Sequence, residues 1–216
     1  FNSYEEFKEK FEITIPENFN FAYDVVDQVA METPDRIAMA WCDDKGNEAT
    51  FTFGQMKYYS DKAANFFRSS GISKGDAVML ILKRHYSFWF CSLALNKIGA
   101  ITIPATHLLS AKDIVYRNNA ADIRMIVCVP EPQVIGHVEE SMKLSPSLKA
   151  KVLIGEEREG WLDFSKGLEE SSADFVRPEG EEATRNHDIM LLYFTSGTTG
   201  MPKMVLVSRS MLSRQN

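Results

Sequence analysis

The sequence contains no apolar stretch long enough to cross a membrane. Its most apolar run, residues 86–95, contains two serines and falls short of the roughly 18 residues that a span requires. Positive charge is not in excess either, since 24 Lys and Arg residues face 30 Asp and Glu residues, for a net charge of −6. Nucleic-acid binders usually carry a basic surface. We therefore expect neither a membrane span nor a nucleic-acid partner.

Cysteine is scarce, with three residues far apart in the chain: Cys42, Cys91 and Cys128. They form neither a CxxC pair nor a disulfide framework, and each lies in an apolar segment. We expect all three to be small buried hydrophobic residues in a reducing, cytoplasmic location. The four histidines are scattered without the spacing of metal ligands, so we expect no metal-ligating residues.

Several catalytic motifs are also missing. The chain has no GxSxG, HExxH or GxGxxG pattern, which removes support for a serine hydrolase, a zinc protease or a Rossmann dinucleotide site. What is present is ordinary for a globular protein of one or two domains: 216 residues, 44% of them hydrophobic and 25% charged.

Hydrophobic periodicity predicts an alternation of helices and strands. The spacing of Tyr4, Phe7 and Phe11 predicts a short helix that packs the N-terminus onto the body. Further helices are expected over about 21–31, 52–70, 86–98, 110–119 and 133–143, and strands over 36–42, 48–53, 77–82, 100–103, 123–129, 152–154 and 189–194. Strands that are apolar throughout, with helices between them, indicate an α/β fold with a mostly parallel sheet flanked by helices.

The chain divides into three parts by composition. Residues 1–170 are expected to form an N-terminal α/β subdomain, and the polar, acidic stretch 171–188 a surface connection. Residues 189–216 then begin a further subdomain with a buried strand.

The stretch 195–203, directly after that strand, has the composition of a polyphosphate-binding loop. Glycines let successive backbone N–H groups turn toward one anion. Hydroxyls donate further hydrogen bonds, and a lysine adds a compact positive charge. Its nine residues are Thr195, Ser196, Gly197, Thr198, Thr199, Gly200, Met201, Pro202 and Lys203. The spacing is not that of a Walker A loop. The alternative is a plain Ser/Thr/Gly turn after a strand.

The eleven residues at 193–203, Tyr-Phe-Thr-Ser-Gly-Thr-Thr-Gly-Met-Pro-Lys, resemble the phosphate-loop motif of the adenylate-forming superfamily. The resemblance extends over nearly the whole chain, through Gly-Asp at 75–76 and Gly-Ala at 99–100 leading to Pro104. Asp-Ile-Val-Tyr-Arg at 113–117 and Gly-Trp-Leu-Asp-Phe at 160–164 are most similar to the medium-chain acyl-CoA synthetase branch, with acetyl-CoA synthetases as relatives.

This resemblance implies a two-step ligase that uses ATP, Mg²⁺ and coenzyme A. A short- or medium-chain carboxylate attacks the α-phosphate of ATP, and the CoA thiol then displaces AMP. The loop 195–203, hereafter the phosphate loop, would hold the β- and γ-phosphates and move during the cycle. Thr195, Ser196, Thr198 and Thr199 would donate hydroxyl hydrogen bonds, Gly197 and Gly200 would give backbone freedom, and Lys203 would add charge. None is expected to be a nucleophile or a general base.

The sequence departs from the family at two positions after the lysine. Val207 stands where the medium-chain branch usually has a histidine, and Arg209 where many other members have one. The family's adenine-binding, Mg²⁺-associated and catalytic lysine motifs lie downstream of Asn216. We therefore expect the chain, which starts at Phe1, to be an N-terminal portion of a longer enzyme. The alternative is a non-catalytic nucleotide-binding or interaction module.

Overall fold

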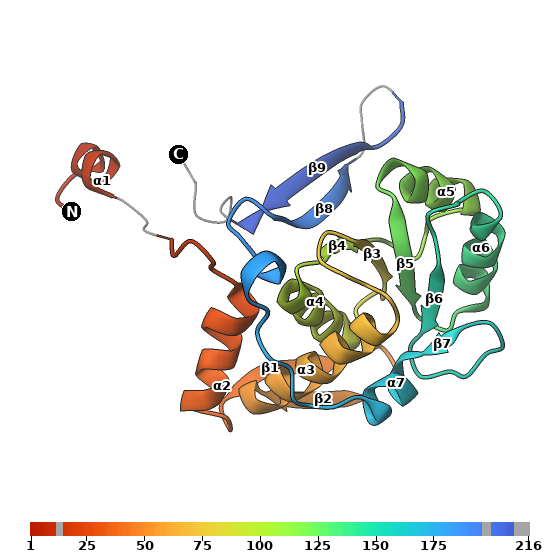
Figure 1. Ribbon diagram of the computed structural model, residues 1–216, viewed down its shortest axis with the longest axis horizontal. Coiled ribbons are helices and arrows are strands. Elements are labelled where there is room, and N and C mark those ends of the chain that lie inside the picture. The colour runs from red at the N-terminus through yellow and green to blue at the C-terminus, as the bar shows by residue number, and fades with distance from the viewer. Residues whose placement is uncertain (12–14, 196–199, 210–216) are drawn as a thin grey trace.

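The computed structural model describes residues 1–11, 15–195 and 200–209. At its centre is a seven-stranded sheet with the strand order β7-β6-β5-β3-β4-β8-β9 (Figure 1). All neighbours pair in parallel except β8 and β9, which are antiparallel. The strands are β3 (Ala77–Ile81), β4 (Ile101–Pro104), β5 (Ile123–Cys128), β6 (Ala150–Leu153), β7 (Leu162–Asp163), β8 (Ile189–Thr195) and β9 (Lys203–Ser208). The mostly parallel sheet expected from the sequence is confirmed.

Helices cover both faces of this sheet, which explains why its central strands are apolar throughout. Val78 and Leu80 of β3 pack with one pair of helices, whereas Met79 and Ile81 of the same strand face the other pair. The first pair is α3 (Phe53–Ser69) and α4 (Ser87–Ile98), and the second is α5 (Ala111–Ala120) and α6 (Pro132–Met142). All five residues of β3 are buried. Because side chains alternate along a strand, burial of both faces requires this continuous apolar run.

Two helices that the sequence predicts, over about 52–70 and 110–119, begin at capping boxes. Thr52 accepts a hydrogen bond from the Gln55 backbone at 3.2 Å, and the Gln55 side chain accepts one from the Thr52 backbone at 2.9 Å. Ser110 and Asp113 make the same reciprocal pair at the start of α5. Each box satisfies backbone N–H groups that a helix start leaves without partners.

The N-terminal third adds smaller elements around this core. They are α1 (Tyr4–Lys10), a π-helical turn η1 (Ala22–Asp27), α2 (Gln28–Glu32) and the antiparallel ribbon of β1 (Ile37–Cys42) and β2 (Glu48–Thr52). The helix expected from Tyr4, Phe7 and Phe11 is present, but none of its residues is buried, and the rings of Phe7 and Phe11 stack on each other at 4.6 Å. The packing of this helix onto the body that we expected is therefore not observed (Figure 1).

A buried lysine joins the N-terminal turn η1 to the helices α3 and α4. Lys97 of α4 is fully buried, and its ammonium donates to Asp27 of η1 at 2.8 Å and to Asp61 of α3 at 2.6 Å. Buried charges are tolerated when they are paired and hydrogen-bonded in this way. The pairing fixes where the N-terminal segment sits on the α3–α4 layer.

The polar stretch 171–188 runs along the surface between α7 (Phe164–Glu170) and β8, with one short 3₁₀ turn at Gly180–Glu182. Lys62 donates to the Ser171 carbonyl, and Lys74 donates to the Ala183 carbonyl at 2.7 Å. The division of the chain at this stretch stays a prediction. Among the described residues, no helix is long and apolar enough to cross a membrane.

Candidate functional site

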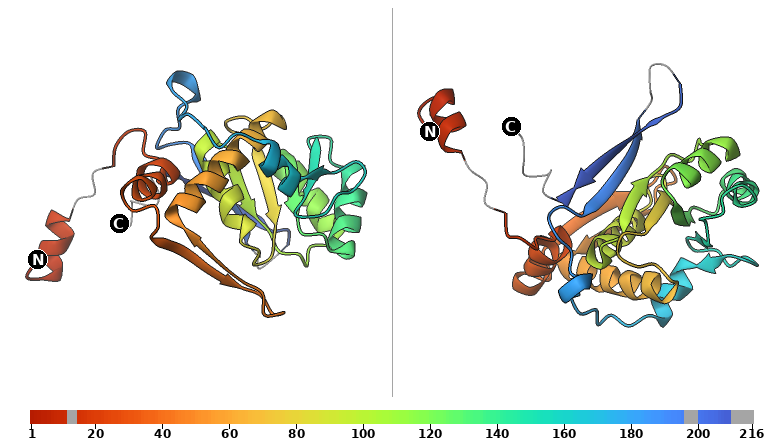
Figure 2. Two further views of the ribbon diagram at one scale, coloured as in Figure 1. Left: turned by 90° about the horizontal axis from the view of Figure 1, so that it is seen from below. Right: turned by 45° about the horizontal axis from the view of Figure 1, so that its top comes forward.

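The β8–β9 hairpin carries the phosphate loop. β8 joins the parallel sheet through Thr102 and Leu191, and β9 returns antiparallel beside it, so that Thr195 and Lys203 form the last pair before the turn. Thr195 Oγ1 donates to the Lys203 carbonyl at 3.4 Å. The loop thus leaves the sheet at the carboxyl end of a parallel strand, the edge at which open α/β sheets bind ligands (Figure 2).

The described residues of the phosphate loop are accessible. Thr195, Gly200, Met201 and Lys203 are exposed, and Pro202 is half-buried. Gly200 has φ of 135°, and no atom lies within 4 Å of the place where a Cβ would stand. This conformation favours glycine and leaves the backbone open to a ligand. Ser196, Gly197, Thr198 and Thr199 lie outside the described residues, and phosphate binding by the nine residues stays a prediction.

Two residues of α5 contact the chain at the two flanks of the phosphate loop, at Pro202 within it and at Phe194 directly before it. Tyr116 Oη donates to the Pro202 carbonyl at 2.8 Å, and the Arg117 guanidinium lies 5.1 Å from the centroid of the Phe194 ring. The sequence reasoning did not assign a site role to either residue. The available signal was the Asp-Ile-Val-Tyr-Arg segment, which was noted only for its likeness to a family.

Arg209 closes the other end of the hairpin. Its side chain is 2% exposed, and it donates to the Asn96 carbonyl and to Asn96 Oδ1, each at 3.1 Å. These acceptors lie at the C-terminal end of α4, where a positive charge is favoured. Burial lowers the pKa of Arg209 to about 10. The arginine that stands in place of a family histidine therefore anchors the base of the hairpin, away from the phosphate loop.

A cavity of about 540 Å³ lies beside the hairpin at the carboxyl ends of β3 and β4, and Tyr193 of β8 forms part of its wall. Its other lining residues include the basic cluster Lys83, Arg84 and His85. Lys83 forms an ion pair with Glu131 at 2.6 Å, and the Arg84 carbonyl accepts from Trp41 Nε1 at 2.6 Å. The cavity thus combines aromatic walls with cationic side chains next to the phosphate loop.

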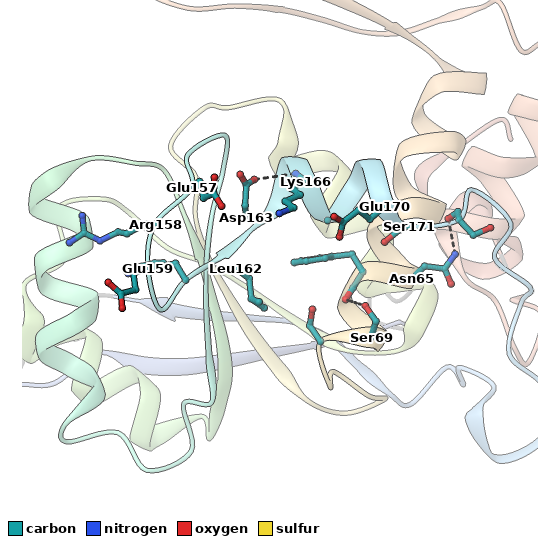
Figure 3. Close-up of a pocket in the computed structure, with 15 residues that line it drawn as sticks. Asn65, Ser69, Glu157, Arg158, Glu159, Leu162, Asp163, Lys166, Glu170 and Ser171 are labelled. Carbon is teal, nitrogen blue, oxygen red and sulfur yellow. Dashed lines mark hydrogen bonds between the residues drawn. The ribbon is translucent and has the colours of Figure 1, made fainter.

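A second cavity, about 970 Å³, lies at the opposite edge of the sheet (Figure 3). Asn65 and Ser69 of α3 face Asp163 of β7 and Lys166 and Glu170 of α7 across it. Because β7 and the β8–β9 hairpin stand at the two ends of the strand order, this cavity is separate from the phosphate loop.

The cysteines do not belong to this site. Burial raises the pKa of the Cys128 thiol to about 12 and also raises the pKa of Cys91, so neither is a ready thiolate nucleophile. Cys42 is exposed, and the expectation that it is buried is wrong. Its apolar segment forms the end of the two-stranded β1–β2 ribbon, which has an open side, whereas the other two cysteines lie in the layered core.

No group of three or more His, Cys, Asp or Glu side chains is placed to hold a metal ion within the described part of the chain. Mg²⁺ usually requires carboxylate oxygens together with phosphate oxygens and water. One or two carboxylates are enough when substrate phosphates and water complete the set, so the Mg²⁺ that the resemblance implies stays a prediction.

Relatives of known activity align over most of this chain. It is 37% identical over 205 residues to the mitochondrial acyl-coenzyme A synthetase ACSM4 of Rattus norvegicus, covering 92% of this chain and 34% of the relative. It is 34% identical over 197 residues to the mitochondrial acyl-coenzyme A synthetase ACSM1 of Homo sapiens, covering 88% and 33%. The chain thus spans about a third of the length of these relatives.

Solved structures of acyl-CoA ligases share the fold. An acyl-CoA synthetase from Brucella canis superposes with a TM-score of 0.81 at 21% identity, covering 98% of this chain and 39% of that one. The anthranilate CoA ligase AuaEII, in complex with anthranoyl-AMP, gives 0.76 at 23% identity, covering 90% and 36%. The family described as AMP-binding enzyme matches residues 26–215. By this match and by its identity to the relatives named above, the chain belongs to the family of AMP-binding enzymes.

Proposed function

We propose that the protein is an AMP-forming acyl-CoA synthetase that activates a short- or medium-chain carboxylic acid. The observation that carries the proposal is the phosphate loop, placed between β8 and β9 at the carboxyl end of a parallel strand with its described residues exposed. Membership of the family, and relatives that are acyl-coenzyme A synthetases, give this loop its chemical context.

The reaction has two steps. A carboxylate oxygen attacks the α-phosphorus of ATP, and the bond to the bridging oxygen breaks, which gives acyl-adenylate and pyrophosphate. The sulfur of CoA then attacks the acyl carbonyl carbon, AMP leaves, and the thiol proton is released. In the first step the attacking and leaving groups are all anionic, so positioning and charge stabilisation contribute most to the rate.

The phosphate loop would contribute to the first step by binding. Lys203 would place a positive charge beside the β- and γ-phosphates, and the Thr195 hydroxyl would donate a hydrogen bond. The open backbone at Gly200 would let a phosphate approach closely. Ser196, Gly197, Thr198 and Thr199 complete the proposed set.

The test is carboxylate-dependent exchange of labelled pyrophosphate into ATP, measured on the full-length protein with a series of straight-chain acids from acetate to dodecanoate. We expect exchange with at least one acid of short or medium length, and formation of the corresponding acyl-CoA when CoA is added. ATP binding without exchange for any acid in the series would contradict the proposal and favour the non-catalytic nucleotide-binding module.

The cytoplasmic location expected from the cysteines stays a prediction. The relatives named above are mitochondrial by name, and their location does not decide that of this protein.

A further inference from the structure

Helix α5 offers a rigid support beside the phosphate loop. It starts at the Ser110–Asp113 capping box, and Ile114 in its first turns is 1% exposed in the core under the sheet. Asn118 further along is fully buried, and its amide donates to Ser145 Oγ at 3.0 Å. A helix fixed at both its start and its end holds the side chains between these points in place.

Tyr116 and Arg117 lie between these anchor points and meet the two flanks of the phosphate loop. Tyr116 Oη donates to the carbonyl of Pro202, the residue before Lys203, at 2.8 Å. The Tyr116 ring also meets the Phe194 ring edge-on at 6.2 Å. Arg117 stands over the same Phe194 ring at 5.1 Å while it donates to the Asp113 carbonyl at 3.0 Å. Phe194 directly precedes Thr195, so one helix contacts the entry and the exit of the loop.

We propose that Tyr116 and Arg117 are positioning residues that hold the flanks of the phosphate loop in the arrangement that receives the phosphates of ATP. This inference rests on the proposed function, because it assigns the loop to ATP. The hydrogen bond to Pro202 fixes the peptide that leads into Lys203, and the contacts on Phe194 fix the strand that leads into Thr195. A loop held at both flanks loses less conformational freedom when a ligand binds, which favours binding.

The size of the effect follows from the nature of the contacts. One neutral hydrogen bond shifts an equilibrium by about two- to tenfold. This is enough to favour one position of the Pro202 peptide and weak enough to be broken during turnover. Both side chains act on ATP only through the flanks of the phosphate loop, so removing either one is expected to lower the affinity for ATP. The carboxylate site is expected to stay unchanged.

The decisive variant is Tyr116→Phe, which removes only the hydroxyl and keeps the ring against Phe194. We expect the KM for ATP in pyrophosphate exchange to rise about two- to tenfold, with kcat and the KM for the carboxylate unchanged. Tyr58→Phe is the matched control, because it removes the same atom from a tyrosine of α3 that is 47% exposed. It should leave all three kinetic constants unchanged.

A second pair of variants tests the contact with Phe194. Arg117→Leu should raise the KM for ATP in the same way, and Arg117→Lys should recover part of the loss because the ammonium keeps the charge but not the planar stacking. An unchanged KM for ATP in both Tyr116→Phe and Arg117→Leu would overturn the inference. So would a parallel rise in both KM values with a lower melting temperature, because that pattern indicates a merely structural role.

Direct ATP binding, measured by titration calorimetry on the same full-length proteins, separates this inference from the proposed function. If no acid supports exchange but Tyr116→Phe still weakens ATP binding, the proposed reaction fails and the inference stands. If the unchanged protein catalyses exchange and the variants bind ATP as tightly as it does, the inference alone fails. If the unchanged protein does not bind ATP, both fail.

Discussion

His85 illustrates how the surroundings of a single side chain determine its charge. It lies in the connection between β3 and α4, where the centroid of its ring is 4.2 Å from that of Tyr86 and 5.8 Å from that of Trp41. Its Nδ1 accepts the Ser87 backbone N–H at 3.2 Å, which requires that this nitrogen carry no proton. Burial lowers the pKa of His85 from its ordinary value of 6.5. The folded protein therefore favours the neutral ring.

This lowered pKa predicts a pH dependence of stability. As the pH falls below about 6.5, the unfolded chain takes up a proton at His85 before the folded chain does, so the free energy of unfolding decreases. The variant His85→Gln should lose this contribution, giving a smaller decrease between pH 7.5 and pH 5.5 in urea unfolding. Equal slopes for the variant and the unchanged protein would refute the prediction.

Some residues of the candidate site could be predicted from the sequence, and others could not. Lys203 and Gly200 were identified because they lie within one short motif. The contact of Tyr116 with Pro202 joins residues that are 86 positions apart, and the contact of Arg209 with Asn96 spans 113 positions. Such pairs form only when the sheet order brings their elements together, and a single sequence does not encode that order in any local pattern.

At the scale of elements, local sequence patterns predicted those helices and strands whose ends are marked by residues within the same segment. The sequence predicted the starts of α3 and α5, where the structure has capping boxes, and the apolar run of β3 predicted a buried strand. The elements that the sequence did not predict include β7, α7 and β9. Met204, Val205 and Leu206 of strand β9 are exposed. Apolar and polar residues do not alternate along this strand, so the hydrophobic pattern does not predict it.

The packing of α7 on α3 depends on a glycine in the middle of a helix. A Cβ added at Gly167 would collide with the Phe66 ring, which is 6% exposed and meets Phe164 edge-on at 5.5 Å. Because the ring is enclosed, it cannot easily move aside. The usual penalty for a helical glycine is thus offset by the close approach of the two helices.

Two glycine-to-alanine changes should therefore alter the free energy of unfolding in opposite directions. Gly167→Ala is expected to destabilise the protein by about 1–3 kcal/mol through overpacking. Gly136→Ala, in α6 with open space around the site, is expected to stabilise it by about 0.5–1 kcal/mol because alanine favours the helix. Chemical unfolding of both variants measures the two free energies. A lack of destabilisation by Gly167→Ala would contradict the packing described for α7, and destabilisation by Gly136→Ala would contradict the open space described around that site.

At the scale of the whole molecule, the strand order of the sheet determines where the phosphate loop and the two cavities lie. The apolar strands and intervening helices were enough to predict a mostly parallel sheet with two covered faces. The strand order was not predictable, and it is this order that sets the phosphate loop and the basic, aromatic cavity at one end of the sheet and the cavity of about 970 Å³ at the other. The placement of β8 beside β4 brings Tyr193 to the cavity at the carboxyl ends of β3 and β4.

Binding of ATP phosphates by the loop 195–203 is the central claim, and the KM for ATP in pyrophosphate exchange by the full-length variant Lys203→Ala tests it most directly. A hydrogen bond to a charged group contributes about 1.5–3 kcal/mol, so we expect a rise of about tenfold or more with an unchanged melting temperature. Lys45→Ala, which alters an exposed lysine in the β1–β2 turn, should behave like the unchanged protein. Normal exchange by Lys203→Ala, with or without a large loss of thermal stability, would contradict the claim.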